Sequence, residues 1–253
     1  MRLIDTHAHL YLEEFSKDFE VVIQRAVKEG VKYIILPNIN SKTIASLHRI
    51  SDPFQGFLIP LMGLHPTSVD ENYESELNTI LEQLQQFQYK GIGEIGIDLY
   101  WEKKYLREQI ITFEKQLEVS VDMQLPVVIH SRDSFPEVLN SVKKFKGLKG
   151  IFHAFSGPQE IAKQIISLGF FLGIGGVLTY KNSQLAELVK TIDLKHMVLE
   201  TDSPYLAPVP YRGKRNESSY LTIIANEIAT LKKVTPEEVY EVTSSNAIEL
   251  FNL

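Results

Sequence analysis

The stretch Leu3-Ile4-Asp5-Thr6-His7-Ala8-His9 is a short apolar run that ends on two histidines one residue apart. Its composition is typical of a β-strand, in which side chains alternate between two faces, so residues i and i+2 share a face. His7 and His9 should therefore direct two imidazoles at one point beside the end of the strand. Two imidazoles at one point indicate a metal ion, whose other ligands must come from elsewhere in the chain.

Seven similar apolar runs follow at intervals of about 20–35 residues, which is the length of a βα unit. The eight predicted strands are Arg2–Thr6, Tyr33–Pro37, Phe57–Met62, Gly91–Ile95, Pro126–Ile129, Gly150–Phe152, Phe170–Ile174 and His196–Leu199. Amphipathic segments with helical periodicity lie between them, such as Asp18–Glu29 and Leu106–Met123. Gly30 and Gly169 are typical of helix ends, and Pro158 is typical of a helix start.

Eight βα repeats indicate an α/β fold, a (β/α)8 TIM barrel, with residues 1–253 forming a single domain. A doubly wound open sheet is the alternative, but no GxGxxG or GxxxxGKS/T loop follows the first strand to favour nucleotide binding there. Two further helices are predicted after the last strand, at roughly Ser218–Leu231 and Pro236–Phe251, the second with Thr235 as its N-cap.

The composition is that of an ordinary globular protein of 253 residues, with 44% hydrophobic and 23% charged residues. Because the chain has no cysteine, a metal site must use His, Asp, Glu, carbonyl groups and water. The net charge of -6 argues against an extended basic groove for duplex nucleic acid. With no signal-peptide pattern and no apolar segment long enough to span a bilayer, we expect a cytoplasmic protein without membrane contact.

Active sites of such barrels lie at the C-terminal ends of the strands, and this chain has most of its histidines there. Five of the seven histidines fall at predicted strand ends, whereas His48 and His196 do not. The polar residues at these ends are His7, His9, His65, Glu94, His130, His153 and Asp202. A single histidine after a strand is often a structural hydrogen-bonding group, but this concentration favours a metal centre.

Four imidazoles and two carboxylates are more than one ion needs, because a catalytic zinc takes three protein ligands and keeps one position open. Six ligands suit two divalent ions about 3.5–4 Å apart. We predict that Glu94 bridges the two ions with its two carboxylate oxygens. The other predicted ligands are His7, His9 and Asp202 at one site and His130 and His153 at the second.

A water bound to such ions loses its proton far more readily than bulk water. Asp202 is placed to orient that water or to accept its proton, and we assign Asp202 and Glu94 as the catalytic residues. Glu200 shares the strand parity of Asp202, and Asp5 lies beside His7, so both are candidates for orienting the metal ligands from behind. Salt bridging within the fold is the structural alternative for both carboxylates.

In this order along the chain, the motifs resemble the TatD family of metal-dependent deoxyribonucleases, within the amidohydrolase-like barrel superfamily. The matching runs are Asp5–His9, Gly63–Pro66, Gly93–Asp98, His130–Arg132, His153–Gly157, Glu200–Leu206 and Arg212–Glu217. The HxH motif is common among metallohydrolases, whereas the acidic run at the fourth strand and the run RGKRNE are far more specific. One departure is Ser218, which stands where the family often has proline; serine suits a helix N-cap and would change the helix start rather than the chemistry.

The resemblance implies a two-metal phosphodiesterase with 3′–5′ exonuclease action on single-stranded DNA, and RNA trimming in some members. The ligands that it implies are His7, His9, Glu94, His130, His153 and Asp202, the set that the strand ends supply. Magnesium is the ion usually named for the family, whereas imidazole ligands favour zinc, manganese or iron. We therefore expect two divalent ions, with Mg2+, Mn2+ and Zn2+ all open.

Candidate substrate contacts also follow the strands. The run Tyr211–Arg215 gathers Arg212, Lys214 and Arg215 after the last strand, which suits a phosphate clamp in an acidic protein; a solvated loop is the alternative. Arg132 and His65 are further candidates for contacting the scissile phosphate or an end hydroxyl. The loop aromatics that stack on bases or pack locally are Trp101, Tyr180, Tyr205 and Tyr211.

The sequence therefore predicts a metal-dependent nuclease that acts on single-stranded nucleic acid and has no obligate protein partner. An amidohydrolase, or an esterase acting on D-aminoacyl-tRNA, is the alternative enzyme on the same barrel. The cationic run Arg212–Arg215 favours the nuclease over an amidohydrolase, because a small neutral amide substrate does not need cationic contacts. A non-catalytic metal-dependent scaffold is the third possibility, and the complete ligand set argues against it.

Overall fold

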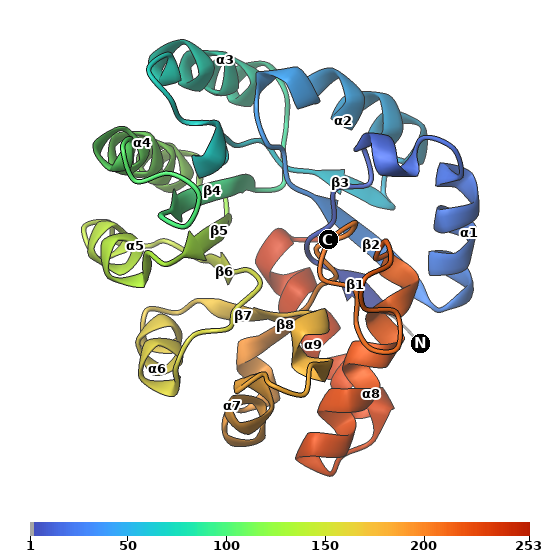
Figure 1. The fold of residues 1–253 in the computed structure, drawn as a ribbon. Helices are drawn as coiled ribbons and strands as arrows, with labels where there is room; N and C mark the ends of the chain where they lie inside the picture. The colour runs from blue at the N-terminus through green and yellow to red at the C-terminus, as the bar shows by residue number, and fades with distance from the viewer. Residues whose placement is uncertain (1–2) are drawn as a thin grey trace.

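Eight parallel strands form the inner wall of the molecule, and helices surround them (Figure 1). The computed structural model describes residues 3–253. The strands are β1 (Leu3–Asp5), β2 (Val31–Leu36), β3 (Leu58–Pro60), β4 (Ile92–Asp98), β5 (Val127–Arg132), β6 (Gly150–Phe152), β7 (Phe171–Ile174) and β8 (Met197–Leu199). Each one overlaps its predicted counterpart, so the eight predicted strands are confirmed; only Arg2 of the first prediction lies outside the described residues.

Backbone pairing closes the strands into a ring. β1, β2 and β3 form one parallel arc, and β4 to β8 form another. Single parallel bridges join the arcs, between Met62 and Ile92 at one junction and between Ala8 and Ser203 at the other. The predicted (β/α)8 barrel is confirmed, and the open doubly wound sheet is excluded because it would leave two free edges.

The helices alternate with the strands and then continue past the last one. They are α1 (Phe19–Lys28), α2 (Ile44–Ser51), α3 (Tyr73–Gln86), α4 (Leu106–Met123), α5 (Phe135–Val142), α6 (Gln159–Ser167), α7 (Leu185–Thr191), α8 (Leu221–Lys232) and α9 (Pro236–Phe251). At the start of α9, the hydroxyl of Thr235 accepts a hydrogen bond from the backbone N–H of Glu238, as expected of an N-cap. Gly30 and Gly169 follow α1 and α6 with φ of 85°, the left-handed conformation that ends a helix.

The start of α8 differs from the expectation for Ser218. This residue does not cap the helix; it begins a 3-10 turn, Ser218–Tyr220, that precedes α8, and Glu217 occupies the cap position of that turn. The physical reason is that Arg25 of α1 holds the Glu217 carboxylate, with Nε 2.8 Å from Oε1 and Nη2 2.5 Å from Oε2. This long-range ion pair fixes the chain one residue before Ser218.

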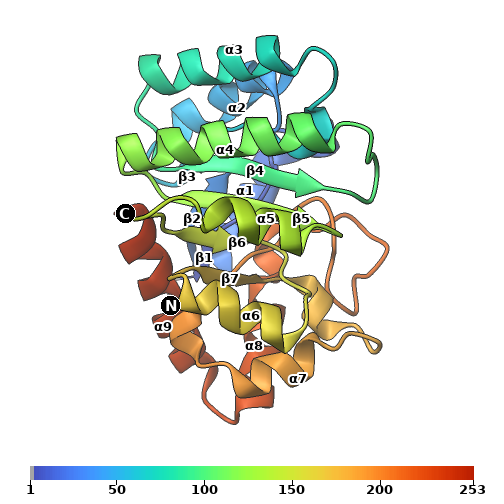
Figure 2. The ribbon, with the colours of Figure 1, turned by 90° about the vertical axis from the view of Figure 1, so that its left-hand side faces the viewer.

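α9 covers the end of the barrel from which the strands start (Figure 2). Buried apolar side chains from the strands meet Ala247 and Phe251 of α9 there; they include Ile4, Ile35, Ile59, Val128, Ile151 and Val198. Burying this surface holds the barrel and its last helix together. The apolar plug leaves the opposite end, where the strands finish, for polar side chains.

None of the helices within residues 3–253 is both long and apolar enough to cross a bilayer.

Candidate metal centre

Glu94 of β4 lies at the middle of a ring of imidazoles and is only 2% exposed. Its Oε2 lies 3.1 Å from Nε2 of His7 and 3.5 Å from Nε2 of His9. Its Oε1 faces the opposite group of nitrogens, at 2.7 Å from His153 Nε2, 2.9 Å from His130 Nδ1 and 3.2 Å from His65 Nε2. One carboxylate thus presents each oxygen to a different set of imidazoles, which is the arrangement of a bridging ligand.

Asp202 joins the group around Oε2. Its Oδ1 lies 3.8 Å from Nε2 of His7 and 3.6 Å from Nε2 of His9. The backbone N–H of Asp202 donates to the carbonyl of His7 at 2.8 Å, so the chain after β8 is tied to the chain after β1. Residues 195 positions apart in sequence therefore meet because β1 and β8 are neighbours in a closed ring.

The donor set fits divalent ions. Nε2 of His7 and Nε2 of His9 are 3.1 Å apart, and Nδ1 of His130 and Nε2 of His153 are 3.2 Å apart. Nitrogens so close, with a buried carboxylate oxygen beside each pair, must share either a proton or a cation between them. Groups with metal-binding geometry among the described residues are His7–His9–Glu94, His65–Glu94–His130 and His7–His153–Glu200.

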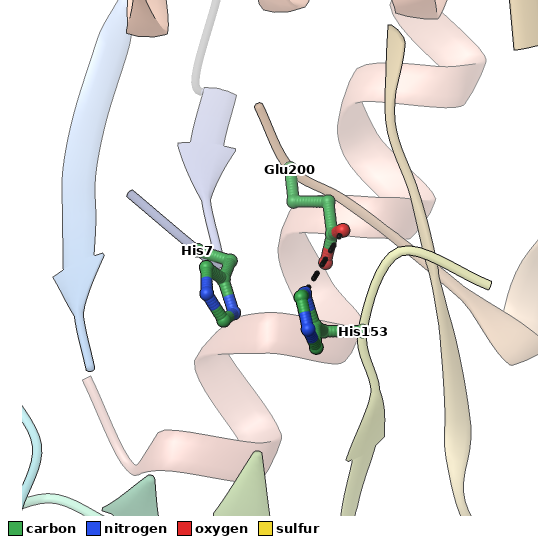
Figure 3. Close-up of side chains that lie close together, drawn as sticks. All are labelled: His7, His153 and Glu200. Carbon is green, nitrogen blue, oxygen red and sulfur yellow. Dashed lines mark ion pairs between the residues drawn. The ribbon is translucent and has the colours of Figure 1, made fainter. Parts of the chain in front are cut away.

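The third of these groups is better read as a support than as a separate site. His7 and His153 stack, with ring centroids 3.9 Å apart, and Glu200 approaches the ring of His153 (Figure 3). Glu200 Oε1 lies 3.7 Å from Nδ1 of His153 and accepts a hydrogen bond from the backbone N–H of Ala154 at 2.6 Å. Nε2 of His153 remains directed at Glu94.

The pKa values of Glu94 and His153 show that nearby positive charge stabilises the buried carboxylate of Glu94. Burial alone would raise the pKa of Glu94, but the charges of His153, His65 and His7 outweigh burial and hold it well below its usual value. Burial opposes protonation of His153 as well, yet Glu94 raises the pKa of His153 well above its usual value. Protons on imidazoles thus balance Glu94 in the metal-free protein, and bound cations can take over that part.

Two side chains that sequence reasoning missed orient ligands of this centre. Asp98 Oδ2 lies 2.8 Å from Nε2 of His130, and the hydroxyl of Tyr11 lies 2.8 Å from Nδ1 of His9. Strand parity was the available signal, because Asp98 lies four residues after Glu94 and Tyr11 lies two after His9. A metal ligand commonly has such a partner on its second nitrogen.

Asp5 contributes differently from the expectation. Its carboxylate accepts hydrogen bonds from the hydroxyl and the backbone N–H of Thr201, at 2.6 and 2.9 Å, and from the backbone N–H of His7 at 3.3 Å. It therefore fixes the backbone on either side of the β1–β8 junction, not the ring of His7. Burial raises the pKa of Asp5 to about 7.

His65 lies closer to the centre than its predicted role as a substrate contact required. Its Nε2 faces Oε1 of Glu94, in the same group as His130. Nδ1 of His65 accepts a hydrogen bond from the backbone N–H of Thr67 at 3.1 Å, which turns Nε2 toward the centre. His65 is therefore also placed to act as a ligand.

A hollow of about 620 Å³ opens over the centre. Its floor includes Glu94, and its walls include Arg132, Trp101 and Tyr205. Trp101 is 69% exposed and Tyr205 is 50% exposed, so neither packs into the fold. Of the predicted substrate contacts, Arg132 and His65 line this hollow.

Arg212, Lys214 and Arg215, the predicted phosphate clamp, are not among the described residues that line this hollow. Arg215 makes a two-pronged ion pair with Asp18, at 2.8 and 2.7 Å, which ties the loop to the start of α1. Arg212 lies 4.4 Å from the centroid of the Tyr180 ring. The ion pair between Arg215 and Asp18 joins two segments that are far apart in the sequence. The guanidinium of Arg215 therefore stabilises the fold.

Comparison with known proteins agrees with this geometry. The chain matches the family model described as TatD related DNase over residues 4–252. It is 36% identical over 254 residues to the Bacillus subtilis (strain 168) protein named "Uncharacterized metal-dependent hydrolase YabD", covering 99% of each chain. The crystal structure of YjjV, a TatD homolog from Escherichia coli K12, matches with a TM-score of 0.93 and 27% identity over 99% of this chain and 98% of that one. A TatD family hydrolase from Entamoeba histolytica matches with a TM-score of 0.85 and 25% identity over 98% and 97%.

Proposed function

Because the chain belongs to the TatD-related DNase family of metal-dependent hydrolases, we propose that it cleaves phosphodiester bonds of single-stranded DNA, releasing nucleotides from the 3′ end. The observation that carries the proposal is the division of imidazoles between the two oxygens of Glu94. A carboxylate shared in this way is what a pair of divalent ions needs. Two ions side by side suit a phosphodiester, whose attacking and leaving oxygens both require stabilisation.

In this proposal Glu94 would help to hold both ions. When bound, the ions would activate a water and stabilise the charge on the attacking and leaving oxygens. The residues that would hold them are His7, His9 and Asp202 beside Oε2, and His65, His130 and His153 beside Oε1. The imidazole-rich set favours manganese or zinc over magnesium, which prefers oxygen ligands.

Asp202 is the residue that we assign to proton transfer. Burial raises the pKa of Asp202 to about 6 in the metal-free protein. A cation beside Asp202 would keep its carboxylate ionised near neutral pH, in the form that can accept the proton of the attacking water. As the water oxygen bonds to phosphorus, the bond from phosphorus to the departing oxygen breaks, and the proton held by Asp202 can pass to that oxygen. Glu94 stays ionised throughout, because bound cations would replace the imidazole charges that hold its pKa well below the usual value in the metal-free protein.

The test uses the purified protein loaded in turn with magnesium, manganese and zinc. Each form is incubated with end-labelled single-stranded DNA, with matched RNA and with an aminoacyl ester. We expect a ladder of shortened DNA from the 3′ end, and loss of that ladder in Glu94→Gln. Hydrolysis of the ester with the oligonucleotides left intact under every metal would show that the esterase alternative is correct.

A further inference from the structure

Trp101 is the only tryptophan in the sequence and is 69% exposed. It lies beyond the end of β4 and lines the hollow over the metal centre. An indole so exposed contributes little to folding, because stabilisation of an aromatic side chain comes from burying its surface. A large exposed aromatic beside a polar centre points instead to contact with a ligand.

The backbone at Trp101 is tied to the metal centre through one carboxylate. Asp98 Oδ1 accepts hydrogen bonds from the backbone N–H groups of Tyr100 and Trp101, at 2.9 and 3.2 Å. Its other oxygen lies 2.8 Å from Nε2 of His130. Asp98 therefore positions both the backbone of Trp101 and the ring of His130, which is a proposed metal ligand.

Arg132 supplies a positive charge beside the two exposed aromatics. Its guanidinium carbon lies 3.8 Å from the centroid of the Tyr100 ring and 5.4 Å from that of Trp101. The two rings meet edge to face, with centroids 4.9 Å apart. Arg132 ends β5, two residues after His130, and it also lines the hollow. A cation and a largely exposed indole thus lie on one wall above the centre.

We propose that Trp101 and Arg132 form a platform that binds one nucleotide of the substrate, with the indole stacked on its base and the guanidinium on its phosphate. The proposal rests on the nuclease function and names the feature of DNA that the hollow recognises. An indole can stack only on a base whose face is free, so the platform selects an unpaired end. Because every base has such a face, the selection is tolerant of sequence.

The intrinsic fluorescence of Trp101 reports on binding at this residue, since the sequence contains no other tryptophan. The magnesium-loaded protein is titrated with phosphorothioate-linked oligothymidylate, which resists cleavage, and with a blunt duplex that contains the same strand. We expect saturable quenching by the single strand and none by the duplex. Deoxyribose 5-phosphate, which has no base, should also leave the fluorescence unchanged.

Variants separate stacking from general binding, with affinity measured by anisotropy of a labelled oligothymidylate. Trp101→Ala should bind about 5- to 150-fold more weakly, the range found when a stacking aromatic is removed, and Trp101→Phe should recover most of that loss. Phe87→Ala is the matched control, because Phe87 is also exposed, at 48%, and does not line the hollow. Its affinity should equal that of the unmodified protein.

The outcomes distinguish the platform from the nuclease function. If the oligonucleotide binds without quenching and Trp101→Ala binds equally well, the platform is wrong, whether or not DNA is cleaved. If quenching occurs but unmodified DNA is never cleaved, the nuclease function is wrong and the platform stands. If no oligonucleotide binds at all, both proposals fail.

Discussion

The hydroxyl of Tyr11 lies 2.8 Å from Nδ1 of His9 and 2.6 Å from the carbonyl oxygen of Pro37. A carbonyl oxygen can only accept, so the phenol donates its proton to Pro37 and must accept from Nδ1–H of His9. This contact fixes the tautomer of His9 and leaves the lone pair of Nε2 directed at Glu94 and Asp202.

Replacing Tyr11 with phenylalanine should weaken metal binding at the site that His9 helps to form. The aromatic packing stays, but the tautomer and the ring orientation of His9 are no longer fixed. We expect one of two ions to bind about 10- to 100-fold more weakly, as is typical when the partner of a ligand is removed. Isothermal titration with manganese measures both affinities; two unchanged affinities would show that Tyr11 has only a packing role.

Loading the metal-free protein should release protons. The hydrogen bonds that His130 donates to Asp98 and Glu94 outweigh burial and raise its pKa, and Glu94 raises the pKa of His153 well above its usual value. His153 therefore carries a proton on both ring nitrogens at neutral pH, the pKa of His130 is shifted in the same direction, and a ring must lose the proton on its ligating nitrogen to bind a metal. Metal affinity should thus fall as the pH is lowered, and an indicator dye in weak buffer should record acidification on adding zinc. Loading at pH 7 without any change of dye colour would contradict this protonation state.

Gly173 of β7 should not tolerate a side chain, because Glu200 occupies the space beside it. A Cβ at Gly173 would overlap Oε2 of Glu200 and lie 2.8 Å from its Cδ. Gly173→Ala should therefore cost about 1–3 kcal/mol of unfolding free energy, as overpacking does, and displace the carboxylate that supports His153. Gly175→Ala is the control, since its Cβ would come no closer than 3.6 Å to Glu200. Urea denaturation compares the two, and equal stability would refute the close packing.

The ion pair between Asp18 and Arg215 should stabilise the fold without contributing to substrate binding. The hydrogen bonds from Arg215 lower the pKa of Asp18 below its usual 3.8. Its contribution is therefore present above about pH 4 and lost as the pH falls through the lowered value. Asp18→Asn should reduce stability at pH 7 by about 0.5–1 kcal/mol, because water screens this partly exposed pair, and the difference should shrink near pH 3.

Arg215→Met, which keeps an unbranched apolar stem but removes the guanidinium, should show a similar loss of stability. In neither variant do we expect KM for an oligonucleotide to change. A rise in KM confined to Arg215→Met would instead restore Arg215 as a phosphate contact.

The sequence by itself determined the strands and the polar residues that gather at their ends. Short apolar runs at regular spacing specify parallel strands, whose C-terminal ends meet at one end of the barrel. Residues such as His7, Glu94, His130 and Asp202 follow those runs directly, so placing the strands also places them. Local pattern was sufficient because a residue at the end of a strand has little freedom to point elsewhere.

The tertiary structure decided which partner each loop residue meets. Tyr11 finds Pro37, and Arg215 finds Asp18 across 197 positions, although nothing local in the sequence distinguishes Arg215 from Arg132 as a phosphate contact. Trp101 stays exposed beside Arg132 because Asp98 holds its backbone at the mouth of the barrel. Such contacts depend on how segments far apart in the chain pack together, and a side chain on a loop takes the partner that this packing brings within reach.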